Sequence, residues 1–101
     1  MKIFCVIPTF NEEKNIKIII DEVRPLVDAL VIVDDGSNDR TADFAETAGV
    51  VLLKHIVNRG QGAALRTGTA YCLNNGADII IHFDGDGQFL SRDIGKIAAP
   101  I

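Results

Sequence analysis

The stretch Ala29-Leu30-Val31-Ile32-Val33-Asp34-Asp35-Gly36-Ser37 decides the fold class of this chain. It opens with five apolar residues rich in valine, a composition typical of a strand that is covered on both faces of a sheet. The aspartates and glycine that follow predict a turn. Three more runs have the same apolar character, so that we predict four strands: 2–8, 29–34, 50–54 and 78–83.

Helical patterns separate these runs. Between the first two, apolar residues recur at the i, i+3, i+4, i+7 positions of one helix face: Ile16, Ile19, Ile20 and Val23. We expect Asn11 to cap this helix and the two glutamates after it to lie in its first turn. Two further helices are expected over about 40–48 and from the glycine-rich segment 58–62 to about residue 74, and the start of another at Ser91.

The order β-α-β-α-β-α-β predicts an α/β fold, a Rossmann-like parallel sheet with right-handed crossovers. Ligands of such open sheets bind at the carboxyl ends of the strands, in the crevice where the strand order reverses. The loops that carry polar residues in this chain all follow predicted strands. We therefore expect any site to lie at that edge of the sheet.

Composition excludes several classes of function. The chain has 101 residues, enough for one domain or a piece of one, and a net charge of −4 without any basic run. Nucleic acid is therefore excluded as a partner, and no apolar run approaches the ~18 residues of a membrane span. We expect Cys5 and Cys72 to be reduced, packed thiols of a cytoplasmic protein, and His55 and His82 to be packed or solvated side chains without a catalytic role.

The segment after the fourth run predicts a metal site. Residues two apart in an extended chain point the same way, so Asp84 and Asp86 can face one point, with Gln88 on the same side. Oxygen ligands of this kind suit Mg²⁺ or Mn²⁺. A solvated Gly-Asp turn is the alternative. An EF-hand is excluded, because Phe89 stands at its glycine position and Gly95 at its closing glutamate.

A second acidic group follows the second run. If the first strand lies between the second and the fourth, Asp34 and Asp84 stand about 9.5 Å apart, a gap that a nucleotide fits. A purely structural interpretation is that Asp35-Gly36 forms a turn and that Ser37 or Asn38 caps the next helix. Both interpretations can hold together.

The loops after the first and third strands add weaker signals. Phe10 can stack on a flat base, and Asn11 or Glu12 can accept hydrogen bonds from its edge. Glycines before a helix form an anion site to which Arg59 or Arg66 adds charge. The same glycines resemble a dinucleotide fingerprint, but its third glycine position holds a leucine, so an NAD-dependent oxidoreductase is a minor alternative.

Taken together, four segments in this order resemble the family 2 glycosyltransferases, most closely the branch of dolichyl- and polyprenyl-phosphate mannose or glucose synthases. The resemblance rests on Pro-Thr-Phe-Asn-Glu-Glu, Val-Asp-Asp-Gly-Ser, Asn-Arg-Gly-x-Gly-Ala-Ala-Leu-Arg-x-Gly and Asp-Gly-Asp-Gly-Gln. It implies a GT-A fold, a nucleoside-diphosphate sugar as donor, Mg²⁺ or Mn²⁺ as cofactor, and sugar transfer with inversion. A nucleotide-binding module without turnover is the alternative.

The resemblance also assigns residues. It implies that the metal and diphosphate are held by Asp84 and Asp86 with Gln88 beside them. It further implies that the donor nucleotide is bound by Pro8, Phe10, Asn11, Glu12, Asp34, Asp35, Gly62, Arg66 and Asp84. Phe10 stands where the family often has tyrosine, and Gln61 where lysine is frequent.

Members of the family are longer, which implies that 1–101 is the nucleotide-binding N-terminal part of a truncated domain. The catalytic base and the acceptor site are expected beyond Ile101, with a lipid phosphate as acceptor at the cytoplasmic face of a membrane. We also expect apolar surface along 79–81, which a second copy or a second polypeptide covers.

Overall fold

The computed structural model describes residues 1–83, and its elements alternate as expected. They are β1 (Ile3–Thr9), α1 (Ile16–Val23), the 3₁₀ helix η1 (Arg24–Leu26), β2 (Ala29–Asp34), α2 (Thr41–Ala48), β3 (Val51–Lys54), α3 (Gln61–Asn74) and β4 (Ile79–His82). Each of the four strands lies within one residue of its predicted bounds. The helix expected from Ser91 lies outside the described residues.

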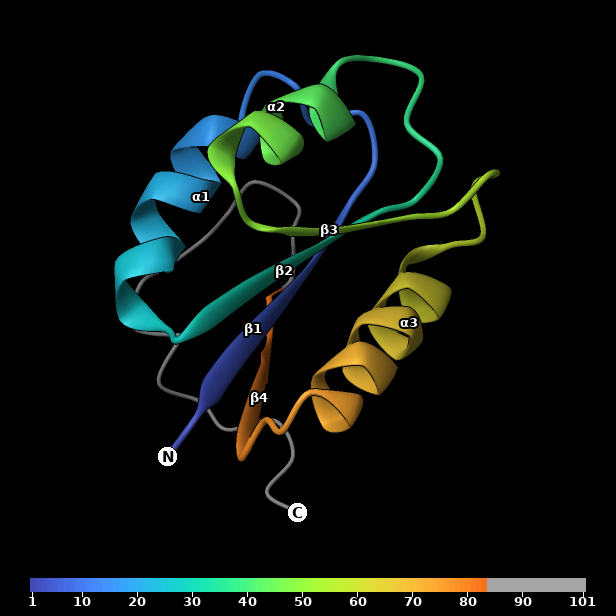
Figure 1. The fold of residues 1–101 in the computed structure, drawn as a ribbon. Helices are drawn as coiled ribbons and strands as arrows, with labels where there is room; N and C mark the ends of the chain where they lie inside the picture. The colour runs from blue at the N-terminus through green and yellow to red at the C-terminus, as the bar shows by residue number, and fades with distance from the viewer. Residues whose placement is uncertain (84–101) are drawn as a thin grey trace.

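The described strands form one parallel sheet in the order β3-β2-β1-β4. This confirms that β1 lies between β2 and β4. Helices α1 and α2 cover one face of the sheet and α3 covers the other (Figure 1). Two apolar cores result, one centred on Ile7, Ile20 and Ile32 beneath α1 and α2, the other on Val6, Val31 and Ile80 beneath α3.

Strand β4 contributes to both cores. Ile80 is 0% exposed and packs on the α3 side, whereas Ile81 is 5% exposed and packs on the side of α1. Successive side chains of a strand point to opposite faces, and here both faces are covered. The expectation that these two isoleucines form apolar surface is therefore wrong; only Ile79 is half-buried.

The expected helix caps are also wrong. Helix α1 begins at Ile16, so that Asn11 and the two glutamates precede it, and Asn15 at the N-cap makes no side-chain cap. Helix α2 begins at Thr41 and is capped by neither Ser37 nor Asn38. The side chains of Asn11 and Ser37 instead take partners across the two loops, as described below.

The two cysteines are free and buried, on opposite faces of the sheet. Burial raises the pKa of the Cys5 thiol to about 12 and that of Cys72 to about 11. Both thiols are therefore neutral packing groups, as the sequence predicts. Among residues 1–83, no helix is long and apolar enough to cross a membrane.

Helix α3 approaches the sheet closely at Gly68. A Cβ placed there would lie 2.3 Å from Cγ1 of Val6 and 3.1 Å from Cγ2 of Val33. We expect Gly68→Ala to destabilise the fold by about 1–2 kcal/mol, because overpacking outweighs the gain in helix propensity. Urea unfolding measures the change. A Val6→Ala substitution in the same chain should recover part of the loss, and a Gly68→Ala variant as stable as the parent would refute the close approach.

Candidate functional site

The carboxyl ends of the strands form the candidate site. Thr9, Asp34 and Lys54 end β1, β2 and β3 in register. Strand β4 lies on the other side of β1, and the Phe83 amide after it donates to the Val6 carbonyl at 2.9 Å. Successive strands thus step in one direction from β1 to β3, and the chain then crosses back to β4. The point where strand order reverses lies between β1 and β4, and Asp84 is the next residue along the chain.

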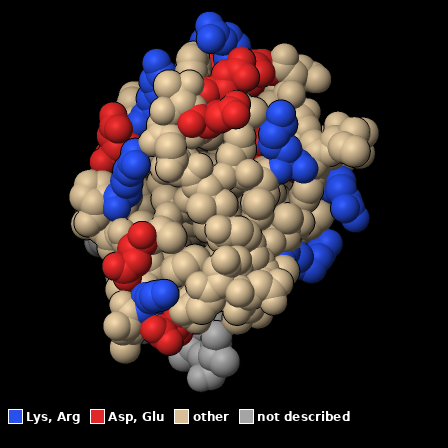
Figure 2. Space-filling view, viewed as in Figure 1, with Lys and Arg blue, Asp and Glu red and all other residues tan. Residues whose placement is uncertain are grey.

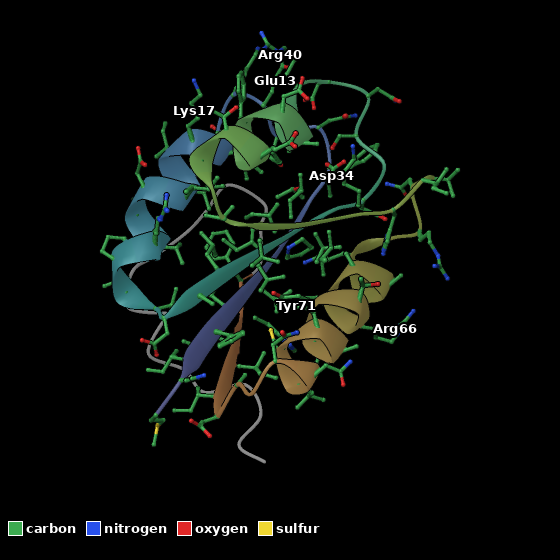
Figure 3. All side chains as sticks on the ribbon, in the orientation of Figure 1. Glu13, Lys17, Asp34, Arg40, Arg66 and Tyr71 are labelled. Carbon is green, nitrogen blue, oxygen red and sulfur yellow. The ribbon has the colours of Figure 1, made fainter. Side chains whose placement is uncertain are left out.

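Asp34 lies at the centre of this edge and is 3% exposed. Its carboxylate accepts hydrogen bonds from the backbone amide and the hydroxyl of Ser37, three residues on. This local bonding holds the turn after β2 and orients the carboxylate. Figure 3 shows Asp34, Glu13 and Arg40 in the upper part of the view, toward the carboxyl ends of the strands.

Asp35 is buried and bound from three directions. Its carboxylate accepts from the amide of Arg59 at 2.9 Å, the amide of Gly60 at 2.8 Å and Nδ1 of His55 at 2.7 Å. Nε2 of His55 lies 2.8 Å from the Thr67 hydroxyl on α3. This Asp35 clamp therefore ties the end of β2 to the loop after β3 and to α3.

Hydrogen bonds keep the carboxylate of Asp35 ionised. Burial alone acts to raise the pKa of Asp35, but the hydrogen bonds from Arg59, His55 and Gly60 outweigh it, and the pKa lies below its ordinary value. An ionised carboxylate only accepts, so Nδ1 of His55 donates to Asp35, and Nε2 pairs with the Thr67 hydroxyl. His55 is thus a packed residue, as the sequence predicts.

The loops after β1 and β2 are joined by reciprocal hydrogen bonds. The Asn11 amide donates to the Ser37 hydroxyl at 2.8 Å, and the Asn38 amide donates to Oδ1 of Asn11 at 2.9 Å. Asn11 has a φ of 53°, in the left-handed region that asparagine tolerates better than most residues. The side chain that the sequence assigned to a helix cap or a base edge therefore serves this junction.

A second set of bonds continues the junction. The Glu12 amide donates to Oγ1 of Thr41 at 2.8 Å, the Glu13 amide to Oδ2 of Asp39 at 3.2 Å, and the Arg40 amide to Oε1 of Glu13 at 2.9 Å. Burial acts to raise the pKa of Asp39, but its hydrogen bonds to Thr41 and Glu13 lower it below the ordinary value. These bonds tie the loop after β1, which flanks the reversal point, to the segment that leads into α2.

Several groups remain on the surface of this edge. The Phe10 ring is 43% exposed, and Asn11 is exposed beside it. At the start of α3, Gly62 and Arg66 are both exposed. The Arg66 guanidinium lies close to Gly62, because a Cβ placed on Gly62 would be 3.5 Å from Nη1 of Arg66. Pro8, in contrast, is buried within β1. The structure thus leaves an aromatic ring accessible beside the reversal point and a guanidinium over the first turn of α3.

The expected metal ligands Asp84, Asp86 and Gln88 lie outside the described residues. Within 1–83, no group of three or more histidine, cysteine or acidic side chains is placed to hold a metal ion. The carboxylates of Asp34 and Asp35 already accept the hydrogen bonds described above. His55, Thr67, Glu13 and Asp39 were not predicted to serve this edge, because their partners lie far away in the sequence and no local pattern marks them.

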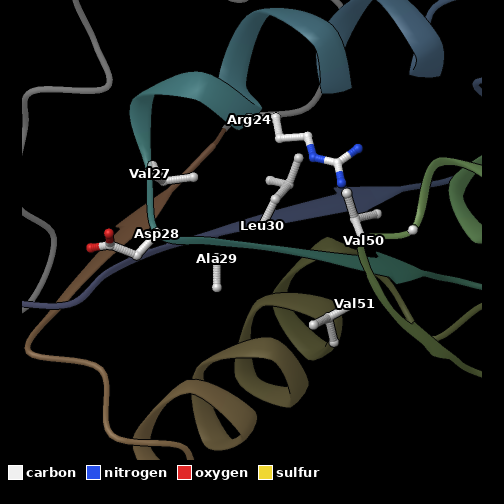
Figure 4. Close-up of a pocket in the computed structure, with 8 residues that line it drawn as sticks. Arg24, Val27, Asp28, Ala29, Leu30, Val50 and Val51 are labelled. Carbon is white, nitrogen blue, oxygen red and sulfur yellow. The ribbon is translucent and has the colours of Figure 1, made fainter.

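A cavity of about 210 Å³ lies at the opposite edge, near the amino ends of β2 and β3 (Figure 4). Its polar groups are used within the fold. The Arg24 guanidinium donates to the Ala48 carbonyl at 2.6 Å, and the Asp28 carboxylate accepts from the Ile3 amide at 2.7 Å. Because Arg24 and Asp28 already bond to the backbone of this chain, the edge at the carboxyl ends of the strands is a stronger candidate for a site than this cavity.

The fold and this edge define an α/β domain of the class whose members bind ligands at the reversal point of a parallel sheet. The chain belongs to glycosyl transferase family 2, whose family model matches residues 4–101. Family membership decides against the oxidoreductase alternative.

Individual relatives agree with this assignment. The chain is 35% identical to a UDP-N-acetylglucosamine–dolichyl-phosphate N-acetylglucosaminyltransferase of Methanococcus voltae, over 98% of this chain and 47% of that protein. It is 31% identical to an undecaprenyl-phosphate mannosyltransferase of Micrococcus luteus, over 96% of this chain and 43% of the relative. The chain thus spans less than half the length of these curated relatives.

A solved structure agrees as well. The glucosyl-3-phosphoglycerate synthase of Mycobacterium tuberculosis, crystallised with Mn²⁺, UDP and glucosyl-3-phosphoglycerate, superimposes with a TM-score of 0.68 at 31% identity. The match covers 84% of this chain and 33% of the synthase. It confirms the expected GT-A fold. The same synthase was also crystallised with Mg²⁺ and UDP.

Proposed function

We propose that this chain forms the donor-binding part of an inverting glycosyltransferase, which binds a nucleoside-diphosphate sugar with Mg²⁺ or Mn²⁺ and transfers the sugar to a polyprenyl phosphate. One observation carries the proposal: β4 lies next to β1 at the reversal point of the sheet, and in the sequence the Asp84-Gly-Asp86 segment comes one residue after the end of β4. That point is where open α/β sheets bind nucleotides.

The described residues divide the work of holding the donor. Phe10 offers an exposed ring on which the base stacks. Asp34, which is 3% exposed and accepts hydrogen bonds from Ser37, holds the turn after β2 beside the nucleoside. The amino end of α3, with Gly62 and Arg66, supplies positive potential for a diphosphate. The Asp35 clamp and the junction of the first two loops keep these groups in place, so that little conformational entropy is lost on binding.

The side-chain oxygens of Asp84, Asp86 and Gln88 fit a hard divalent cation. When bound, such a cation supplies Lewis acidity to the departing nucleoside diphosphate. The relatives favour particular substrates: UDP appears both in the name of the Methanococcus protein and in the synthase complex. Two sequence relatives are named for lipid-phosphate acceptors, and we therefore favour UDP as the donor nucleotide and a polyprenyl phosphate as the acceptor.

Calorimetry tests donor binding. We expect UDP to bind this chain in the presence of Mn²⁺ and to lose most of its affinity when the metal is chelated. GDP in the same titration tests the choice of base, and NADH serves as the control for the rejected oxidoreductase. Binding that is independent of metal, or no binding at millimolar UDP, would contradict the proposal.

Phe10 supplies the sharpest test of base stacking. We expect Phe10→Ala to weaken UDP binding about tenfold, since stacking of a base on an aromatic ring contributes roughly 1–3 kcal/mol. Because the ring is 43% exposed, the thermal unfolding midpoint should change little. Phe10→Leu is the matched control, since it keeps apolar area but no ring face. If the leucine variant binds UDP as tightly as the parent, the base does not stack on residue 10.

A further inference from the structure

The tip of the loop after β3 carries two exposed aliphatic side chains. Ile56 is 99% exposed and Val57 is 62% exposed. Figure 1 shows this loop, between β3 and α3, projecting beyond the sheet at the right of the view. Ile56 has the highest exposure among the large apolar residues described in 1–83. We call Ile56 and Val57 the apolar tip.

The exposure of the apolar tip is imposed by the fold. On one side, His55 is fixed by Asp35 and Thr67; on the other, the amides of Arg59 and Gly60 donate to Asp35. Val57 and Asn58 also pack their backbone on Gly36, where a Cβ would lie 2.6 Å from the Asn58 nitrogen. With both ends of the loop anchored, the two side chains between them point to solvent.

The exposed charged side chains of the segment that carries the apolar tip are basic, and the ionised Asp35 to which the loop is bound is only 3% exposed. The segment 47–77 contains Lys54, Arg59 and Arg66 and no aspartate or glutamate, although the whole chain has a net charge of −4. All three cations are exposed, and within residues 1–83 none of them forms an ion pair. Figure 2 shows Lys and Arg without Asp or Glu on the right-hand flank of this view, over the start of α3 and the loop before it.

From these observations we infer that the apolar tip inserts into the surface of a membrane that carries anionic lipid headgroups, with Lys54 and Arg59 contacting the headgroups. Aliphatic side chains ringed by cations suit the boundary between headgroups and acyl chains. Two side chains on one loop are too small for a stable protein interface, which needs roughly 1,000 Å². A lipid surface needs no complementary pocket, and its negative charge complements Lys54 and Arg59.

The apolar tip lies at the same edge of the sheet as the candidate site, because its loop follows the carboxyl end of β3. Docking through this loop would turn that edge toward the membrane, where a lipid phosphate is reached. The inference that the apolar tip binds lipid does not depend on the proposed function. The inference that this binding brings the site to a lipid phosphate rests on the proposed function.

Vesicle flotation with the 101-residue chain tests the inference, using phosphatidylcholine vesicles with and without phosphatidylglycerol and no donor or acceptor. We expect binding that requires phosphatidylglycerol and weakens as salt is raised. The double variant Ile56→Ser/Val57→Ser should bind at least about tenfold more weakly, by the transfer energies of these side chains. Leu26→Ser, which changes a 47% exposed leucine of η1 at the opposite edge, is the matched control and should bind as the parent does.

The charged residues have their own comparison. Lys54→Gln/Arg59→Gln should reduce binding, whereas Lys2→Gln/Lys14→Gln, with the same change in net charge, should leave it unchanged. Equal binding to neutral vesicles, or full binding by the serine double variant, would overturn the inference. So would self-association in light scattering that depends on the apolar tip without vesicle binding, since a second copy would then be its partner. UDP calorimetry on the same variants reports donor binding separately, so failure of one proposal is distinguishable from failure of the other.

Discussion

Replacing Asp86 with asparagine is expected to lower the rate of sugar transfer about 100-fold or more in the glycosyltransferase that carries this segment. The nucleoside diphosphate leaves with negative charge, and Asp86 is the proposed ligand that holds a cation against it. In the 101-residue chain, the same substitution should remove most of the Mn²⁺-dependent affinity for UDP. Because the change is isosteric, the thermal unfolding midpoint should stay near that of the parent.

Asp21→Asn is the matched control, since Asp21 is an exposed aspartate on α1, remote in sequence from the reversal point. It should change neither transfer nor UDP affinity. If Asp86→Asn kept full activity with Mn²⁺, the metal would have to be held by other residues, and the assignment from the resemblance would be wrong.

Replacing Asp35 with alanine is expected to reduce the free energy of unfolding by about 3 kcal/mol. The substitution leaves the amides of Arg59 and Gly60 and Nδ1 of His55 without their acceptor, and each unpaired buried donor costs roughly 1–3 kcal/mol. Urea unfolding followed by circular dichroism measures the loss. UDP affinity should fall as well, because the loop after β3 and the start of α3 lose their attachment to β2.

Asp43→Ala provides the control, since this side chain is 66% exposed and pairs with Arg40 at 3.7 Å on the surface. It should cost no more than about 0.5 kcal/mol. A double-mutant cycle between Asp35→Ala and His55→Ala should show a coupling of about 1 kcal/mol or more. Additive losses would mean that the two side chains act independently.

The contribution of Asp35 should also depend on pH. Its pKa in the folded chain lies below the ordinary value of 3.8, so its stabilising effect is fully present above that value. The effect is lost as the pH falls through the lowered pKa, where the carboxylate takes up a proton in the folded state too. The difference in stability between the parent and Asp35→Ala should therefore shrink below about pH 4. A difference that stays constant down to pH 2 would mean that the charge of Asp35 is not what stabilises the clamp.

Much of the architecture can be predicted from local pattern. Runs of valine and isoleucine are typical of strands buried on both faces, and the spacing of Ile16, Ile19, Ile20 and Val23 identifies one helix face. Alternation of these elements predicts a parallel sheet, and the polar segments after each strand predict the edge at which a ligand binds. The expected strands, helix face and parallel sheet are confirmed, because period and composition act over a few neighbouring residues.

The roles of individual polar side chains could not be predicted in this way. Asn11 is a sound helix cap by local rules, yet it bonds to Ser37 and Asn38, which the parallel pairing of β1 and β2 brings beside it. Asp35 was expected to meet a nucleoside, and the structure shows it holding the loop after β3 through His55, Arg59 and Gly60. A polar group takes the partner that satisfies it best when buried, and only the tertiary structure brings such distant partners together.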